Sequence, residues 1–239
     1  MKALQQLRSL ALIFLTALAL LPGLAAAQQY SNYYENRRID ADVRGQTWTL
    51  PTTLYLGLET ANGSDTGCGT EAAWTSYARP SYASSLTNWA GTQSAGSTTA
   101  STGTGGQTSN NVAISWATPG SGPTTVTGFC VFDAGLTTLS AAISTTGATS
   151  MTVTSASQFP GSGNYYVLID SEVVQVTAGQ GTTTWTITRG ALGTTAATHS
   201  NGAAVSGMML WRNTLTSSKV INSGDTVQFP IGSLTYTVD

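Results

Sequence analysis

Charged side chains are scarce in this sequence. Only 8% of the residues are Asp, Glu, Lys or Arg, whereas soluble domains usually carry about a quarter. After residue 27 seven basic and eleven acidic residues remain, a formal charge of −4. An acidic, sparsely charged chain offers no basic surface for nucleic acid. The 41% of hydrophobic residues still supply a core, which argues against disorder along the whole chain.

Motifs of the common chemistries are also missing. One histidine and two cysteines are too few for a zinc site. There is no G-x-S-x-G elbow and no Gly-rich phosphate loop followed by Lys-Ser or Lys-Thr. A pair of catalytic carboxylates is not excluded, because such residues meet only in the fold. The candidates are Glu59, Glu71, Asp133, Asp170 and Glu172. We predict no catalytic residue, cofactor or metal site, because a β-rich chain usually spends so few charges on turns and solubility.

The N-terminus differs in composition from the rest of the chain. Two basic residues precede an apolar run from Leu10 to Leu21, Pro22-Gly23 breaks the run, and residues 25–27 are alanines. This order predicts a secretory signal peptide over residues 1–27 and an exported protein. The run is short for a membrane span. An uncleaved anchor and a start codon assigned too early are the alternatives.

Two cysteines, Cys68 and Cys130, are present. In an exported chain an even number predicts a disulfide, because the compartment is oxidising. Two buried free thiols are the alternative. We favour the disulfide.

The segment Val126 to Ala134, V-T-G-F-C-V-F-D-A, predicts the central strand of the fold, because it is apolar on both faces. Abundant Thr and Val with Gly-rich turns favour β structure. We predict an all-β fold: a β-sandwich-like host domain (residues 28–135 and 207–239) with one N-terminal helix, and a small β module, the insert (residues 136–206), inserted in a loop. The low-complexity stretch from Gly91 to Asn110 predicts a long loop.

Residues 30–45 predict the helix. Asn32 is the expected N-cap, with Glu35 three residues later as in a capping box, and Gly45 suits the C-terminal end. Such a helix either covers a sheet, which is ordinary architecture, or docks a partner subunit. The residues assigned to such an assembly helix are Tyr33, Tyr34, Arg37, Arg38, Ile39 and Arg44.

Within the insert, alternating strands predict hairpins. Tyr165 to Ile169 and Val173 to Val176 are joined by the turn residues Asp170-Ser171-Glu172. The one histidine, His199, lies in T-H-S-N-G, which predicts an exposed turn.

The ordered set of motifs in the host domain resembles a family of small phage virion structural proteins of the tail-fibre or minor structural type. The stretches that carry the resemblance are S-N-Y-Y-E-N with R-G at 31–45, T-L-Y-L-G-L at 53–58, G-T-E with Y-A-R at 69–79, G-F-C-V-F-D-A at 128–134, and the C-terminal segment from L-T-S-S-K to Y-T-V-D. The insert resembles a module of phage tail proteins, with I-D-S-E followed by T-R-G-x-x-G-T-x-A-x-x-H.

The resemblance implies a virion component without catalytic residues. A signal peptide is unusual in such proteins, which assemble in the cytoplasm, and it suggests an exported, prophage-derived relative. The partners expected are copies of the same chain in an oligomer or filament, or other virion or surface proteins. A secreted filament or surface-layer subunit, and a lectin-like adhesin that binds a cell-surface glycan, are the alternatives.

Overall fold

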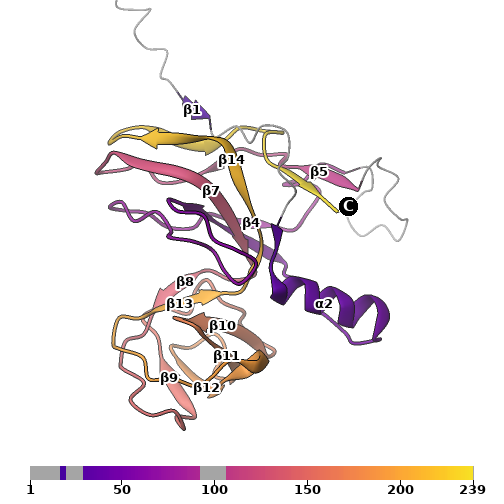
Figure 1. The fold of residues 1–239 in the computed structure, drawn as a ribbon, viewed down its shortest axis with the longest axis vertical. Helices are drawn as coiled ribbons and strands as arrows, with labels where there is room; N and C mark the ends of the chain where they lie inside the picture. The colour runs from indigo at the N-terminus through magenta and orange to yellow at the C-terminus, as the bar shows by residue number, and fades with distance from the viewer. Residues whose placement is uncertain (1–16, 20–28, 92–105, 239) are drawn as a thin grey trace, which may run out of the picture.

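The structure is a computed structural model of the 239-residue chain, and it describes residues 17–19, 29–91 and 106–238. These residues are mostly β, with one α-helix, α2 (Asn32–Val43), and one 3-10 helix, η1 (Ala191–Gly193). The all-β prediction with one N-terminal helix is therefore confirmed. Figure 1 shows two β units along the long axis, with α2 beside them where they meet. No helix in the described ranges is long and apolar enough to cross a membrane.

The host domain contains two main layers. Its five-stranded sheet is antiparallel in the order β2 (Gln29–Tyr30), β14 (Met209–Ile221), β7 (Thr124–Phe132), β3 (Thr53–Glu59) and β4 (Ser81–Ala83). A three-stranded sheet contains β1 (Ala17–Ala19), β15 (Thr226–Phe229) and β6 (Ile114–Ser115). A separate pair joins β5 (Gln107–Ser109) to β16 (Thr235–Thr237).

The host core lies between these layers. Phe129 on β7 contacts Trp211 on β14 and Phe229 on β15, with ring centroids 5.5 and 5.1 Å apart. Leu56 and Leu58 on β3 are fully buried in the same cluster. The other face of β7 also packs: Cys130 and Phe132 form a small cluster with Met209. The central strand is thus apolar on both faces, as its sequence predicts.

The insert forms its own six-stranded sheet. The order is β8 (Leu136–Thr138), β13 (Ala204–Gly207), β10 (Tyr165–Ile169), β11 (Glu172–Ala178), β12 (Thr184–Thr188) and β9 (Ser150–Thr152). The predicted hairpin is present as β10 and β11, which pair from Tyr165 to Ile169. Trp185 is fully buried at the centre of a second hydrophobic cluster, which shares no residue with the host core.

The chain leaves and re-enters the host at adjacent positions. The backbone N–H of Asp133 donates to Met208 O at 3.1 Å, and that of Gly207 donates to Gly135 O at 2.9 Å. A Cβ atom at Gly207 would lie 2.5 Å from the backbone of Ala134, so only glycine permits this approach. The two connections between host and insert therefore run side by side.

One local prediction is corrected, and the predicted signal peptide stays a prediction. The expected loop from Gly91 to Asn110 contains strand β5, which pairs with β16 near the C-terminus; residues 92–105 lie outside the described residues. The signal peptide, residues 1–27, also lies mostly outside them. Its residues 17–19 form β1, parallel to β15.

Candidate functional site: the helix and the junction

The N-cap residue of α2 is Ser31, whereas the sequence predicts Asn32. The Ser31 side chain accepts a hydrogen bond from the Tyr34 backbone N–H at 3.1 Å and donates to Met209 O. The Ser31 backbone also donates to Leu210 O at 3.0 Å. These bonds fix residue 31 against β14. The capping-box pattern places the cap one residue too late because it contains no information about β14.

One side of the helix packs on the host. The rings of Tyr34 and Tyr30 stack with centroids 5.0 Å apart, and Tyr34 meets Trp48 edge-on at 5.2 Å. The hydroxyl groups of Tyr34 and Tyr236 are 2.8 Å apart, which joins the helix to β16 at the other end of the chain. The predicted assembly residue Tyr34 therefore holds the helix in place.

A second side of the helix contacts the insert. Arg37 lies over the rings of Tyr33 and Tyr166, with its Cζ atom 5.6 and 5.1 Å from the two centroids. Tyr33 also meets Tyr166 edge-on at 6.3 Å. Cation–π contacts of this kind are favourable where the cation is desolvated. Tyr33 and Arg37 thus bridge the host helix and strand β10 of the insert.

Asp133, which follows strand β7 shortly before the insert, lies beside this bridge. Its Oδ1 atom accepts the backbone N–H of Met208 at 2.7 Å. Burial raises the pKa of Asp133 to about 7, although hydrogen bonds from Met208 and Tyr33 oppose the shift. Burial, and then the Asp133 carboxylate, raise the pKa of Tyr33 as well. Asp133 is therefore a carboxyl group that titrates near neutral pH.

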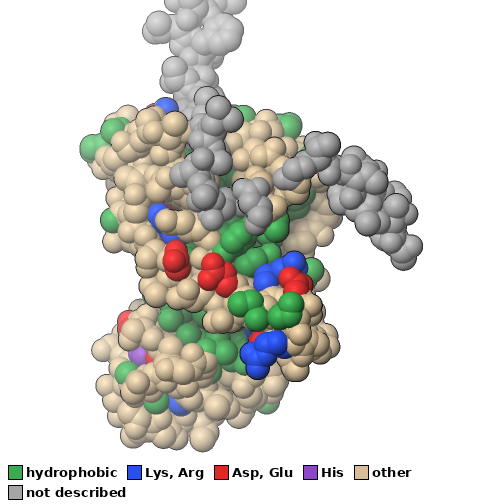
Figure 2. Space-filling model, turned by 45° about the vertical axis from the view of Figure 1, so that its right-hand side comes forward, with side chains coloured by type: hydrophobic (Ala, Val, Ile, Leu, Met, Phe, Trp, Pro, Cys, Tyr) green, Lys and Arg blue, Asp and Glu red, His purple; other side chains and the backbone are tan. Residues whose placement is uncertain are grey.

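The outer side of α2 is open to solvent. Ile39 and Val43 are 51% and 77% exposed, and Leu50 after the helix is 60% exposed. Two exposed ion pairs lie on the same helix, Arg38–Asp42 and Arg44–Asp40, each 2.9 Å long. Figure 2 shows hydrophobic, basic and acidic side chains gathered at the waist of the molecule, where the helix comes forward. Among the predicted assembly residues, Arg38, Ile39 and Arg44 are exposed, whereas Tyr33, Tyr34 and Arg37 face the body.

A buried arginine joins the host to both ends of the insert. Arg79 is 5% exposed, and its Nε and Nη2 atoms donate to the Glu71 carboxylate at 2.8–3.1 Å. Its Nη1 atom donates to Gly135 O at 3.3 Å and to Ser206 Oγ at 3.0 Å. The guanidinium also lies 3.4 Å from the ring centroid of Phe132. Local sequence patterns do not predict this role, because Arg79 is 127 residues from Ser206.

Cys68 and Cys130 lie together in the structure as a disulfide, with their Cα atoms 5.9 Å apart. The fully buried Glu59 lies beside them and accepts hydrogen bonds from Arg212 Nε and Nη2 at 3.1 and 2.6 Å. In the described part of the chain, Glu59 and the two cysteines are the one group of three His, Cys, Asp or Glu residues whose ligand atoms all lie within 4.8 Å of one another. The disulfide and the arginine occupy these groups, so they offer no metal site.

The second conspicuous charge cluster lies inside the insert. Glu172 is fully buried and accepts hydrogen bonds from Arg189 Nε and Nη2 at 2.7 and 2.6 Å. Burial would raise the pKa of Glu172, but hydrogen bonds from Arg189, the Ala197 backbone, His199 and the Gly190 backbone lower it to about 2. These residues belong to the I-D-S-E and T-R-G segments of the sequence. The cluster fixes the turn after β12 against the start of β11.

The prediction that His199 lies in an exposed turn is wrong. His199 is 3% exposed, and its Nδ1 and Nε2 atoms lie 2.7 and 2.8 Å from carboxylate oxygens of Asp170 and Glu172. The turn lies at Asn201-Gly202, whereas His199 pairs with Ile143 as an isolated β-bridge and carboxylates from a distant hairpin cover its ring. Four of the five candidate catalytic carboxylates thus bind arginine or histidine side chains, and the fifth, Asp133, binds the Met208 backbone.

Comparison with known proteins supports a structural role. The family model for the podophage GP4 fiber I protein gp80 matches residues 29–160, more than half of the chain. The match includes α2, β3, β7 and both cysteines. A search of the curated proteins finds no match. The chain therefore belongs to the podophage fiber I protein gp80 family, a family of phage fibre structural proteins.

Proposed function

We propose that this protein is a non-enzymatic fibre subunit that assembles with a second copy of itself through the outer face of α2. The observation that carries the proposal is the exposed face itself. A family of fibre proteins supplies the context, and no residue of α2 is buried although Ile39 and Val43 share one side of it. Exposed apolar side chains that lie together on a surface can mark an interaction site.

The exposed face of the helix fits a second copy. Two α2 helices packed antiparallel about Ala41 place Ile39 of each copy opposite Val43 of the other. The ion pairs Arg38–Asp42 and Arg44–Asp40 can stay within each copy, and they add little to the contact because surface ion pairs contribute only about 0–1 kcal/mol. Such a contact is isologous, which is the usual geometry of a homodimer. Repetition of a dimer through further contacts would extend it toward a fibre.

Analytical ultracentrifugation of residues 28–239 over a range of concentrations tests this proposal. We expect a concentration-dependent dimer or larger species, and we expect the double variant Ile39→Glu/Val43→Glu to shift it to monomer. Leu192→Glu is the matched control, since Leu192 is 53% exposed on the insert and should leave assembly unchanged. A full mature chain that stays monomeric at high concentration would contradict the proposal.

Export before assembly is the second part of the proposal. It is supported by the signal-peptide pattern of residues 1–27. Cleavage after Ala27 would remove β1 and leave β15 paired with β6 alone. Intact-mass analysis of protein expressed with its own N-terminus, from cells and from medium, decides it. Retention of residues 1–27 in all of the protein, with none in the medium, would refute export.

A further inference from the structure

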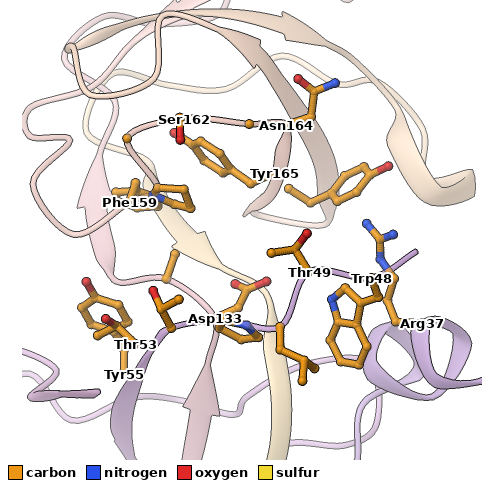
Figure 3. A pocket seen from close by; sticks show the side chains of 18 of the residues that line it. Arg37, Trp48, Thr49, Thr53, Tyr55, Asp133, Phe159, Ser162, Asn164 and Tyr165 are labelled. Carbon is orange, nitrogen blue, oxygen red and sulfur yellow. The ribbon is translucent and has the colours of Figure 1, made fainter. Parts of the chain in front are cut away.

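The host and the insert meet around a pocket of about 660 Å³. The insert wall is the loop of residues 158–166, and the host wall is formed by α2 and the segment of residues 47–55. Figure 3 shows Asp133 at the floor of the pocket and Arg37 at one side. Because the host and insert clusters share no residue, the two walls can move apart without disturbing either hydrophobic core.

The contact that closes one side of the pocket is the Tyr33–Arg37 bridge. Tyr33 meets the Tyr166 ring edge-on at 6.3 Å, and the Arg37 Cζ atom lies 5.1 Å from the Tyr166 ring centroid. The Arg37 Nε atom is buried and has no hydrogen-bond partner among the described residues. A buried donor without a partner opposes the arrangement that buries it, and separation of the walls would expose Arg37 to water. The bridge therefore holds the pocket closed only weakly.

The two chain crossings between host and insert lie at the floor of the pocket, which Asp133 and Ala134 line. Beside them the Gly207 N–H donates to Gly135 O at 2.9 Å. Arg79 also donates to Gly135 O, at 3.3 Å, so the first crossing stays attached to the host. Hinges consist of a few residues next to the ends of elements, where a change in backbone angles is absorbed. The paired crossings have this form.

Asp133 lies between this hinge and the bridge. Its Oδ1 atom accepts the Met208 N–H at 2.7 Å, and its carboxyl group also bonds to the Tyr33 side chain. Burial raises the pKa of Asp133 to about 7, so the closed pocket favours the protonated carboxyl group. Separation of the walls would hydrate the carboxylate and remove that preference. Ionisation of Asp133 therefore favours an open pocket.

Among the described residues that line the pocket, Asp133 is the one whose charge changes between about pH 4 and 8. Arginine keeps its charge and tyrosine stays neutral throughout that range. Arg79, which is paired with Glu71, contacts Phe132 and Gly135. The charged and titratable groups around Asp133 in the pocket are Tyr33 and Arg37 on α2, Tyr55 on β3, and Tyr165 and Tyr166 on β10.

We propose that Asp133 is a pH switch at this joint: its protonated form keeps the insert closed on α2, and its ionised form lets the insert swing away about Gly135 and Gly207. Between about pH 4 and 7 the closed state holds a proton that the open state releases, because the pKa in the closed state is raised from 3.8 to about 7. The ratio of open to closed molecules therefore rises by up to about tenfold per pH unit in this window and levels off above pH 7. The bridge lies on the inner side of α2, so the switch does not depend on assembly through the outer face.

Double electron–electron resonance between two spin labels measures the joint. The labels are attached through Leu50→Cys and Ser162→Cys, at exposed positions that line opposite walls of the pocket. Residues 28–239 also carry Ile39→Glu/Val43→Glu, so the distance is measured within one chain whatever the outcome for self-assembly. We expect a short distance near pH 4 and a growing fraction of longer distances up to pH 7. The pair Leu50→Cys and Thr87→Cys, both on the host, is the control and should give the same distance at every pH.

Two further variants separate the switch from the bridge. Asp133→Asn removes the titration, so its distances should not change with pH, whereas Asp42→Asn, on the exposed face of α2, should follow the wild type. Tyr166→Ala removes the bridge and should raise the open fraction severalfold at each pH while the pH dependence remains; this result does not require Asp133→Asn to fold. A distance that is independent of pH, or that changes equally in Asp133→Asn, would overturn the proposal. Equal changes in the host pair would overturn it too, because they would show that the whole protein unfolds.

Discussion

Six charged side chains of the described residues lie in three buried or nearly buried pairs. Glu59 with Arg212 and Glu172 with Arg189 are almost completely covered, and Arg79 with Glu71 is nearly so. Each arginine binds both oxygens of its carboxylate or adds backbone acceptors, which offsets the desolvation of the charges. Removal of one partner would leave an uncompensated buried charge.

At the scale of one residue, Asp133 should make stability depend on pH. Its pKa is raised from 3.8 to about 7 in the folded protein. Between these values the folded state holds a proton that the unfolded state releases, so stability should fall as the pH rises from about 4 to 7. The slope is at most about 1.4 kcal/mol per pH unit. Denaturant unfolding midpoints measured at several pH values check this.

Asp133→Asn should remove this part of the slope, because an amide does not titrate. Asp42→Asn, on the exposed face of α2, is the control and should follow the wild type. Any change of stability with pH that all three proteins share arises from other titrating groups, so it cancels when the proteins are compared. An Asp133→Asn protein with the wild-type pH profile would show that the carboxyl group titrates normally.

Sequence reasoning found acidic residues that matter but not what they contact. Glu59, Glu71 and Glu172 stand out among few acids, whereas their arginine partners lie 8 to 153 residues away. Periodicity and spacing report local structure only, so they cannot identify pairs that form when distant strands meet. The same reason explains the error at His199, whose local sequence is that of a turn. The pocket between α2 and the loop of residues 158–166 was not predicted, because the residues that line it come from separate segments of the chain.

At the scale of elements, substitutions can show which of two adjacent residues, Ser31 or Asn32, caps the N-terminus of α2. Ser31→Ala should destabilise the protein by about 1 kcal/mol or somewhat more, because it removes the cap of the Tyr34 N–H and the bond to Met209 O. Asn32→Ala, one residue later and exposed, should change stability by less than about 0.5 kcal/mol. Chemical denaturation of both variants gives the comparison. A larger loss for Asn32→Ala would assign the cap to Asn32 instead.

The disulfide links the loop after β3 to the central strand β7. Cys68 and Cys130 are 62 residues apart, and closing a loop of that length stabilises a fold by about 4 kcal/mol in the chain-entropy model. We expect protein purified without reductant to carry the bond, and reduction to lower its melting temperature. The intact mass of the protein after alkylation without reductant shows whether Cys68 and Cys130 are bonded. Two alkylated cysteines in the unreduced protein would show that the thiols are free.

Strands with strict alternation or two apolar faces were predictable, whereas the short polar strand β5 was not. β7, β3 and the β10–β11 hairpin carry hydrophobic patterns that are complete within a few residues. β5 and β16 have three residues each, and their pairing joins positions 107–109 to 235–237. No pattern of that length distinguishes a strand from a polar loop. Polar Thr and Ser form these strands because their partner supplies the hydrogen bonds.

At the scale of the whole molecule, two cores are joined by two adjacent chain crossings. The host and insert clusters have no residue in common. Arg79, Asp133 and the Tyr33–Arg37 bridge hold the units together with polar and aromatic contacts. Interfaces of this composition are easier to separate than a shared hydrophobic core. The division into a host domain and an insert therefore remains a prediction with a direct test.

Deletion of residues 137–206, with a short Gly-Ser bridge in their place, should leave a folded host. The ends to be joined are adjacent, since Asp133 N–H donates to Met208 O at 3.1 Å, and closing a short loop there costs little entropy. Arg79 would lose Ser206 but keep Glu71, so we expect a lower melting temperature with cooperativity retained. Calorimetry of the deletion protein, with residues 135–207 expressed alone as the reciprocal control, measures this. Loss of a cooperative transition in the deletion protein would show that host and insert fold only together.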